Sequence, residues 1–203
     1  MAFLMLVQLF VNRWLISCVR RFFTLQNSTL ILLIFFCLFN SGLYRLHAND
    51  SREYQIKAAF LFNFVQFVKW PPASFPDPSS PFRIGILGDD PFGSALDETI
   101  RGETIGRHRL VILRAQKIED LKECQIIFVS RSEENRITEI LSQINSKPIL
   151  TVSEVQSFTR SGGNINFYLS SGKIHFEINP QSAERSGLKM SSQLLTLGKI
   201  VKQ

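Results

Sequence analysis

Four short apolar segments constrain the fold of this chain more than any other feature. They run for seven or eight residues each, with polar, turn-forming or helical patterns between them: FRIGILG (82–88), HRLVILRA (108–115), CQIIFVS (124–130) and KPILTVS (147–153). Apolar runs of this length with such boundaries are typical of buried strands. Because helical patterns lie between them, they predict βαβ units and a mostly parallel sheet flanked by helices.

Two of the intervening segments have helical patterns. DDPFGSALDETIRG follows the first strand, and we expect Asp89 or Asp90 to cap its helix, with Pro91 in the first turn. EENRITEILSQINS follows the third strand, and its amphipathic pattern places four apolar residues on one face: Ile137, Ile140, Leu141 and Ile144. Both helices fit the connections that parallel strands require.

The C-terminal part has a different pattern. NINFYLSSGKIHFEIN (164–179) alternates apolar and polar residues on both sides of a Ser-Ser-Gly turn, which predicts a β-hairpin. Two short helical segments follow, around Pro180–Ser186 and Ser191–Val201. The proline-rich loop Pro71–Pro81 is the only linker-like stretch, so we expect residues 49–203 to form a single α/β domain with a C-terminal β-hairpin.

Residues 1–48 have the composition of a secretory signal peptide. They contain no acidic residue, carry four arginines, and include a ten-residue apolar run, Leu30–Phe39, before a weakly polar stretch that ends at Ala48. The run is too short to span a bilayer comfortably, since a spanning helix needs about 20 residues. We therefore expect cleavage after Ala48, a periplasmic mature protein, and no stable membrane span after cleavage. An uncleaved N-terminal anchor is the alternative.

Removal of the leader would lower both the net charge and the number of cysteines of the mature protein. Four of the 23 basic residues belong to the leader, so the remaining 19 face 17 acidic residues and the mature net charge is only +2. This balance gives no electrostatic footprint for nucleic acid. Cys18 and Cys37 also belong to the leader, which leaves Cys124 without an internal disulfide partner. A small buried side chain is the favoured role for Cys124, and an intermolecular disulfide is the alternative.

The sequence lacks recognisable catalytic motifs. It contains no G-x-S-x-G, no Walker A pattern and no paired-carboxylate arrangement. His108 stands between two arginines, which disfavours a metal, and His175 shares a strand face with Glu177 but has no third ligand at a recognisable spacing. A solvated strand face is the simpler interpretation of His175. We therefore expect no enzymatic activity, no cofactor and no metal.

The segment GILGDDPFG resembles a phosphate-binding turn, because a glycine loop enters a helix. Its two aspartates would repel phosphate, so helix capping is the better explanation. Gly88, Asp89 and Asp90 nevertheless follow a strand, and ligands of α/β sheets bind beyond the carboxyl ends of strands. They are the ligand-loop candidates of an alternative function, a periplasmic small-molecule binding or sensing protein.

The segment EYQIKAAFLFNFVQFVKWPP (53–72) predicts an unusually apolar helix. Most of its large apolar residues fill one wide arc, yet Lys57 falls near the centre of that arc and Asn63 at its edge, while Phe62 projects from the polar face. In one interpretation Lys57 snorkels to water and Asn63 caps an internal group. In the other, the helix faces both the sheet and a second protein. The candidate partner contacts are then Lys57, Phe62, Asn63, Trp70 and Phe75.

Five segments resemble the YfiR family of bacterial periplasmic proteins in order and spacing over Glu53–Val201. They are EYQIKAAFLFNFVQFVKWPP, GILGDDPFG, CQIIFVS, PILTVSEVQSFTRSGGNINFYLSSGKIHFEIN and SGLKMSSQLLTLGKIV. The resemblance implies a compact α/β domain, often a homodimer, with no known enzymatic activity. The best-known member binds the periplasmic part of an inner-membrane diguanylate cyclase and holds it inactive, which lowers cyclic di-GMP output. The resemblance therefore implies an exported regulator that binds an inner-membrane signalling protein, of diguanylate cyclase or sensor kinase type. That member carries cysteine pairs used for disulfides, whereas only Cys124 is available here.

Overall fold

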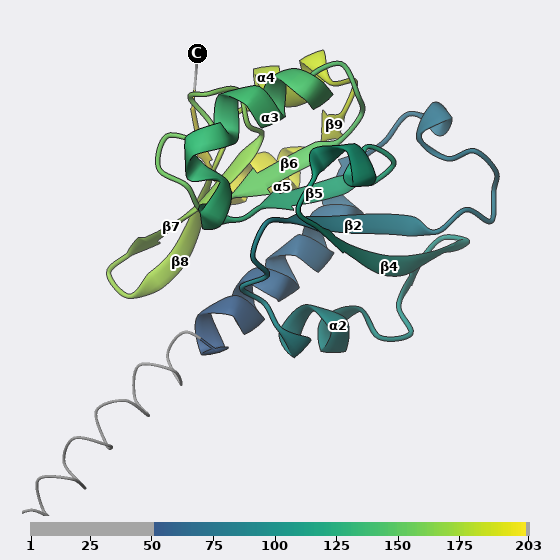
Figure 1. Ribbon diagram of the computed structural model, residues 1–203, viewed down its shortest axis with the longest axis horizontal. Coiled ribbons are helices and arrows are strands. Elements are labelled where there is room, and N and C mark those ends of the chain that lie inside the picture. The colour runs from purple at the N-terminus through teal and green to yellow at the C-terminus, as the bar shows by residue number, and fades with distance from the viewer. Residues whose placement is uncertain (1–50, 202–203) are drawn as a thin grey trace, which may run out of the picture. The chain divides into compact units, whose positions relative to one another are not determined.

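Eight strands form one sheet within residues 51–201, the part of the chain that this computed structural model describes (Figure 1). The expected leader, residues 1–48, lies outside the described residues. The strand order is β10-β8-β7-β6-β5-β2-β4-β3. In chain order the strands are β2 (Phe82–Leu87), β3 (Thr104–Ile105), β4 (His108–Ala115), β5 (Ile126–Val129), β6 (Leu150–Ser153), β7 (Ile165–Ser170), β8 (Lys173–Ile178) and β10 (Lys199–Ile200).

The sheet is mostly parallel, as the sequence predicts. In the centre, Ile84 of β2 lies opposite Ile112 of β4 on one side and Ile126 of β5 on the other, both in parallel register. The β7–β8 hairpin and the short β3–β4 pair are antiparallel, and β10 lies parallel to β8 at the edge. The five strands β4, β2, β5, β6 and β7 therefore have the order 2-1-3-4-5, which is the order of flavodoxin-like doubly wound sheets.

Helices cover both faces of this sheet, as Figure 1 shows for α3 on one side and α2 on the other. The helix of residues 51–67, called the 51–67 helix below, packs on the same face as α2 (Ser94–Ile100) and α5 (Ser192–Leu197). The opposite face carries α3 (Ile137–Ile144) and the 3-10 helix η2 (Ile118–Leu121). The remaining elements are η1 (Pro72–Ser74), η3 (Arg131–Arg136), α4 (Pro180–Arg185) and the paired short strands β1 (Val68–Lys69) and β9 (Lys189–Met190).

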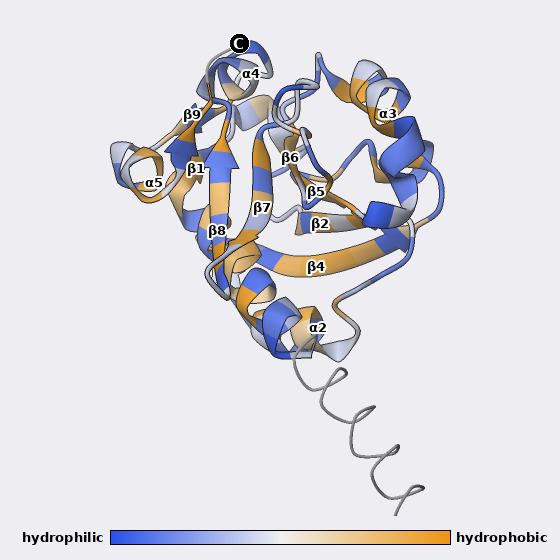
Figure 2. Ribbon diagram, turned by 90° about the vertical axis from the view of Figure 1, so that its left-hand side faces the viewer, coloured by the Kyte–Doolittle hydropathy of each residue, from blue (hydrophilic) through white to orange (hydrophobic). Residues whose placement is uncertain are grey.

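Hydropathy explains this layering. The four apolar residues predicted on one face of α3 are all buried, and Figure 2 shows the helix with distinct apolar and polar sides. On the other face of the sheet, Phe64 of the 51–67 helix is 1% exposed and stacks on Phe167 of β7 at a ring-centroid distance of 5.9 Å. The apolar arc of the 51–67 helix therefore faces the sheet. This is one of the two contacts expected if the helix faces both the sheet and a second protein.

The hairpin turn is also confirmed. Ser171 and Gly172 connect β7 to β8 with φ of 51° and 71°, the left-handed region that two-residue hairpin turns require. The second helical segment of the tail is shorter than predicted, because α5 ends at Leu197 and Lys199–Ile200 joins the sheet as β10. Gly198 permits this close approach, since a Cβ there would lie 2.6 Å from a side-chain carbon of Ile178.

Candidate functional site

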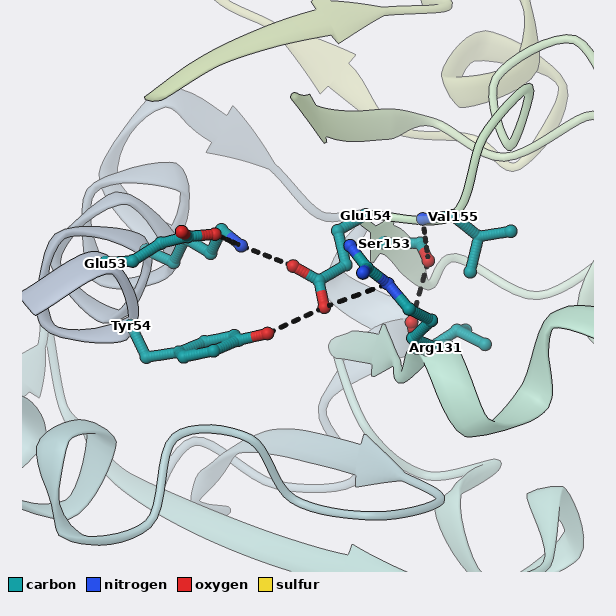
Figure 3. Close-up of polar contacts among 8 residues, drawn as sticks. Glu53, Tyr54, Arg131, Ser153, Glu154 and Val155 are labelled. Atoms are coloured by element: carbon teal, nitrogen blue, oxygen red, sulfur yellow. Dashed lines mark hydrogen bonds and ion pairs between the residues drawn. The ribbon is translucent and has the colours of Figure 1, made fainter. Parts of the chain in front are cut away.

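A buried ionic cluster lies at the edge of the sheet where the parallel strands end. Its centre is Lys57, in the second turn of the 51–67 helix, whose side chain is only 3% exposed. The Lys57 ammonium forms ion pairs with Glu53, one helical turn earlier, and with Glu154, which directly follows β6 (Figure 3). It also lies 4.4 Å from the ring centroid of Tyr54, within range of a cation–π contact.

The Glu154 carboxylate is contacted by three other side chains of the cluster: Tyr54, Lys57 and Arg131. Its side chain is 4% exposed, and it accepts a hydrogen bond of 2.8 Å from the Tyr54 hydroxyl. Nε of Arg131 lies 3.9 Å from the same carboxylate, and Figure 3 shows these groups converging on it. Burial, then the hydrogen bond to Glu154 and the nearby carboxylates, raise the pKa of Tyr54. Tyr54 therefore stays protonated and remains a donor near neutral pH.

The backbone after β6 aims Glu154 at Lys57. The Ser153 hydroxyl donates to the Val129 carbonyl at 2.7 Å and accepts from the Val155 N–H at 3.1 Å, which fixes the turn out of the strand (Figure 3). Lys57 is thus held inside the fold by two carboxylates, and the snorkelling interpretation is wrong. The position is also too buried for the partner contact that the sequence suggested.

One wall of a polar pocket is formed by this cluster. The pocket has a volume of about 390 Å³ and is also lined by Arg131, Arg160, Asn166 of β7 and Glu177 of β8. Asn166 is 5% exposed, and its side-chain oxygen Oδ1 has no hydrogen-bond partner within residues 51–201. Buried polar atoms in proteins are nearly always paired, so this oxygen is an unusual feature of the pocket.

Of the other four candidates for partner binding, the three aromatic residues are half-buried and Asn63 is exposed. Phe62 and Trp70 are half-buried against the main core. Trp70 also donates from Nε1 to the Gln125 carbonyl at 3.0 Å. Phe75 is half-buried and stacks on the His108 ring at 4.1 Å. Asn63 is exposed on the helix, so it does not cap an internal group.

The ligand-loop candidates follow β2, near the point where the strand order reverses. Gly88 has a φ of +85° and leaves no room for a side chain, since a Cβ would lie 2.3 Å from the Ser132 hydroxyl. The Asp89 N–H donates to that hydroxyl at 3.0 Å. Asp90 accepts from the Phe92 N–H at 2.8 Å and from Arg114 at 2.6 Å. These contacts tie the loop to its own neighbours.

Neither aspartate caps the following helix, in contrast to the prediction. α2 begins at Ser94, and its N-cap is Gly93, which offers no side-chain acceptor. Asp90 instead stabilises the turn before the helix and pairs with the Arg114 guanidinium of β4. The polar pocket described above is lined by residues after β6 and in β7, so it does not include Gly88, Asp89 or Asp90.

The two histidines and the cysteine of residues 51–201 contact neighbouring groups of the fold or are buried in it. Nδ1 of His108 lies 2.6 Å from the Ser80 carbonyl oxygen, and exposed His175 stacks on Tyr168 at 5.6 Å. Cys124 is 2% exposed, as predicted, and burial raises the pKa of its thiol to about 12. Within the described part of the chain, no three His, Cys, Asp or Glu side chains gather closely enough to hold a metal ion.

Comparison with known proteins supports the family resemblance. The family model described as YfiR/HmsC-like matches residues 54–199. Among solved structures, the chain is similar to the crystal structure of a conserved domain protein from Vibrio cholerae O1 biovar El Tor strain N16961, with a TM-score of 0.50 and 11% sequence identity. That match covers 73% of this chain and 60% of the other, and at this identity it concerns the fold alone.

No helix within residues 51–201 is long and apolar enough to cross a bilayer. The family match spans nearly all of these residues and includes the ionic cluster except Glu53, which precedes the matched range. This chain therefore belongs to the YfiR/HmsC-like family, a regulatory and non-enzymatic family of periplasmic proteins.

Proposed function

We propose that this protein is an exported periplasmic regulator that controls an inner-membrane signalling protein, of diguanylate cyclase or sensor kinase type, by direct contact. The observation that supports this function is the family match over residues 54–199. The leader-like composition of residues 1–48 agrees with export.

The outward face of the 51–67 helix is the proposed contact surface. Six of its exposed positions lie on one side of the helix and form one continuous stripe: Arg52, Gln55, Ile56, Ala59, Asn63 and Gln66. Ile56 is 44% exposed at one border of this stripe, and half-buried Phe62 lies at the other border. Apolar and aromatic groups surrounded by polar ones are typical of protein interfaces.

The ionic cluster gives this surface a rigid base. Lys57 binds Glu154 from the opposite side of the same helix, so the stripe is fixed relative to the sheet. A fixed surface lowers the entropy cost of binding, because few side chains and no backbone need to be ordered. Trp70 and Phe75, in the segment after the helix, remain secondary contact candidates because their rings are only half-buried.

Site-specific photo-crosslinking in the source cells tests this function. A photoreactive residue at Asn63 should crosslink to an inner-membrane signalling protein, whereas the same residue at Arg107, which is exposed at the far edge of the sheet, should not. If such a protein crosslinked to position 107 but not to position 63, the contact surface would lie at the far edge of the sheet and not on the 51–67 helix. If neither position reached an inner-membrane signalling protein, the proposed function would be wrong.

A further inference from the structure

We propose that the polar pocket beside Glu154 binds a small organic anion, a carboxylate or phosphate with a neighbouring hydroxyl or amine. This site differs from the helix surface assigned to the protein partner, and the inference does not depend on that function. The volume of about 390 Å³ lies within the range of ligand sites, roughly 300–1,000 Å³. The pocket opens at the carboxyl edge of the sheet, where α/β folds bind ligands.

The carboxylates that line the pocket already have donors from the protein. Glu154 accepts from Tyr54 and pairs with Lys57. Lys57 also pairs with Glu53, and Glu177 accepts from the Thr159 hydroxyl at 2.6 Å. The carboxylates of the pocket therefore have protein donors and do not require a cationic ligand.

The Arg131 guanidinium is in a different situation. Its side chain is 69% exposed, and its Nε lies 3.9 Å from Glu154, which is beyond hydrogen-bond length. Arg160 lines the same pocket and adds positive charge. A planar guanidinium whose N–H groups make no hydrogen bond within residues 51–201 matches the oxygens of a carboxylate or phosphate. The anionic part of the ligand is therefore assigned to Arg131.

Asn166 defines the second requirement. It lies in β7, where it pairs with Ser153 of β6 and Glu177 of β8, and it is 5% exposed. Its Oδ1 is an acceptor that no donor within residues 51–201 reaches. A ligand hydroxyl or amine would satisfy this oxygen, whereas an ionised carboxylate offers only acceptors. The pocket therefore selects molecules that combine both groups.

Thermal unfolding of the purified protein with paired probes tests this selection. We expect at least one of sn-glycerol 3-phosphate, D-glycerate and L-serine to raise the melting temperature at about 10 mM, by mass action on the folded state. Glycerol has the hydroxyls without the anion, and acetate has the anion without the donor, so both should have little effect. If no combined probe raises the melting temperature, or if acetate matches them, the proposal is wrong.

Two variants then locate the bound probe. Arg131→Gln should weaken binding roughly 10- to 100-fold, the usual loss of a charge-assisted hydrogen bond, while Arg107→Gln removes the same charge at the far edge and should change nothing. Asn166→Leu should abolish binding without lowering the melting temperature of the free protein, since it removes an unpaired buried acceptor. Unchanged affinity in Arg131→Gln would place the probe elsewhere and overturn the assignment.

Discussion

Lys57→Met tests the buried ionic cluster most sharply. Methionine keeps much of the length and packing of the lysine stem but removes the ammonium between Glu53 and Glu154. Removing one partner of a buried ion pair costs about 3–5 kcal/mol, because the other charge stays buried. Here Glu154 keeps the Tyr54 hydroxyl as a donor, and Glu53 has an 18% exposed side chain that water can reach. We therefore expect a loss near the lower limit, about 3 kcal/mol.

Urea unfolding followed by Trp fluorescence measures this free energy. Lys147→Met is the matched control, since the Lys147–Glu123 pair has a separation of 3.6 Å and side chains that are 38% and 76% exposed. An exposed pair of this kind contributes about 0–1 kcal/mol. The double variant Lys57→Met/Glu154→Gln should recover much of the loss, because both charges are removed and the glutamine oxygen can still accept from the Tyr54 hydroxyl. If Lys57→Met lost no more than the control, the cluster would not stabilise the fold as argued.

Further predictions concern the Cys124 thiol, the phenylalanines of the 51–67 helix and the expected leader. Because burial raises the pKa of Cys124 to about 12, Ellman's reagent should label the native thiol slowly and the unfolded thiol fast. The free energy of unfolding should also fall as the pH rises above about 8.5, where the unfolded thiol ionises first; rapid native labelling would contradict the burial. Phe64→Ala should cost about 3–5 kcal/mol, and Phe62→Ala clearly less because its ring is half-buried; equal losses in urea unfolding would place Phe62 in the core. Mass spectrometry of periplasmic protein should find a chain that begins near Asn49, whereas an intact leader in the membrane fraction would establish an anchored form.

The fold was largely predictable because the central strands are buried on both faces. Continuous apolar runs such as Ile126–Val129 have no polar alternation to confuse their assignment, and β5 is buried at every position. The two-residue strands were not predictable. Lys199–Ile200 follows a helical pattern in the sequence and becomes a strand only because β8 offers it an unpaired edge.

The sequence indicated the ionic cluster only through the unusual position of one lysine. Lys57 stands out in an apolar arc, and a buried ammonium requires a carboxylate, but sequence spacing identifies only Glu53, at i−4. Glu154 is 97 residues away and reaches Lys57 through the turn after β6. Asn166 gave no signal, because its pattern in the hairpin resembles any polar position of an alternating strand. Asn166 is buried in β7 between β6 and β8, and this placement is a tertiary effect.

Control of a membrane signalling protein is tested most directly by the output of that protein in its own membranes. The measurement compares cyclic di-GMP synthesis, or autophosphorylation for a sensor kinase, with and without the purified regulator on the periplasmic side. We expect wild-type protein to change the output, and Ile56→Asp, which alters the exposed helix stripe without entering the core, to have a much weaker effect. An output that wild-type protein leaves unchanged in every inner-membrane signalling protein of the source organism would contradict the proposed function.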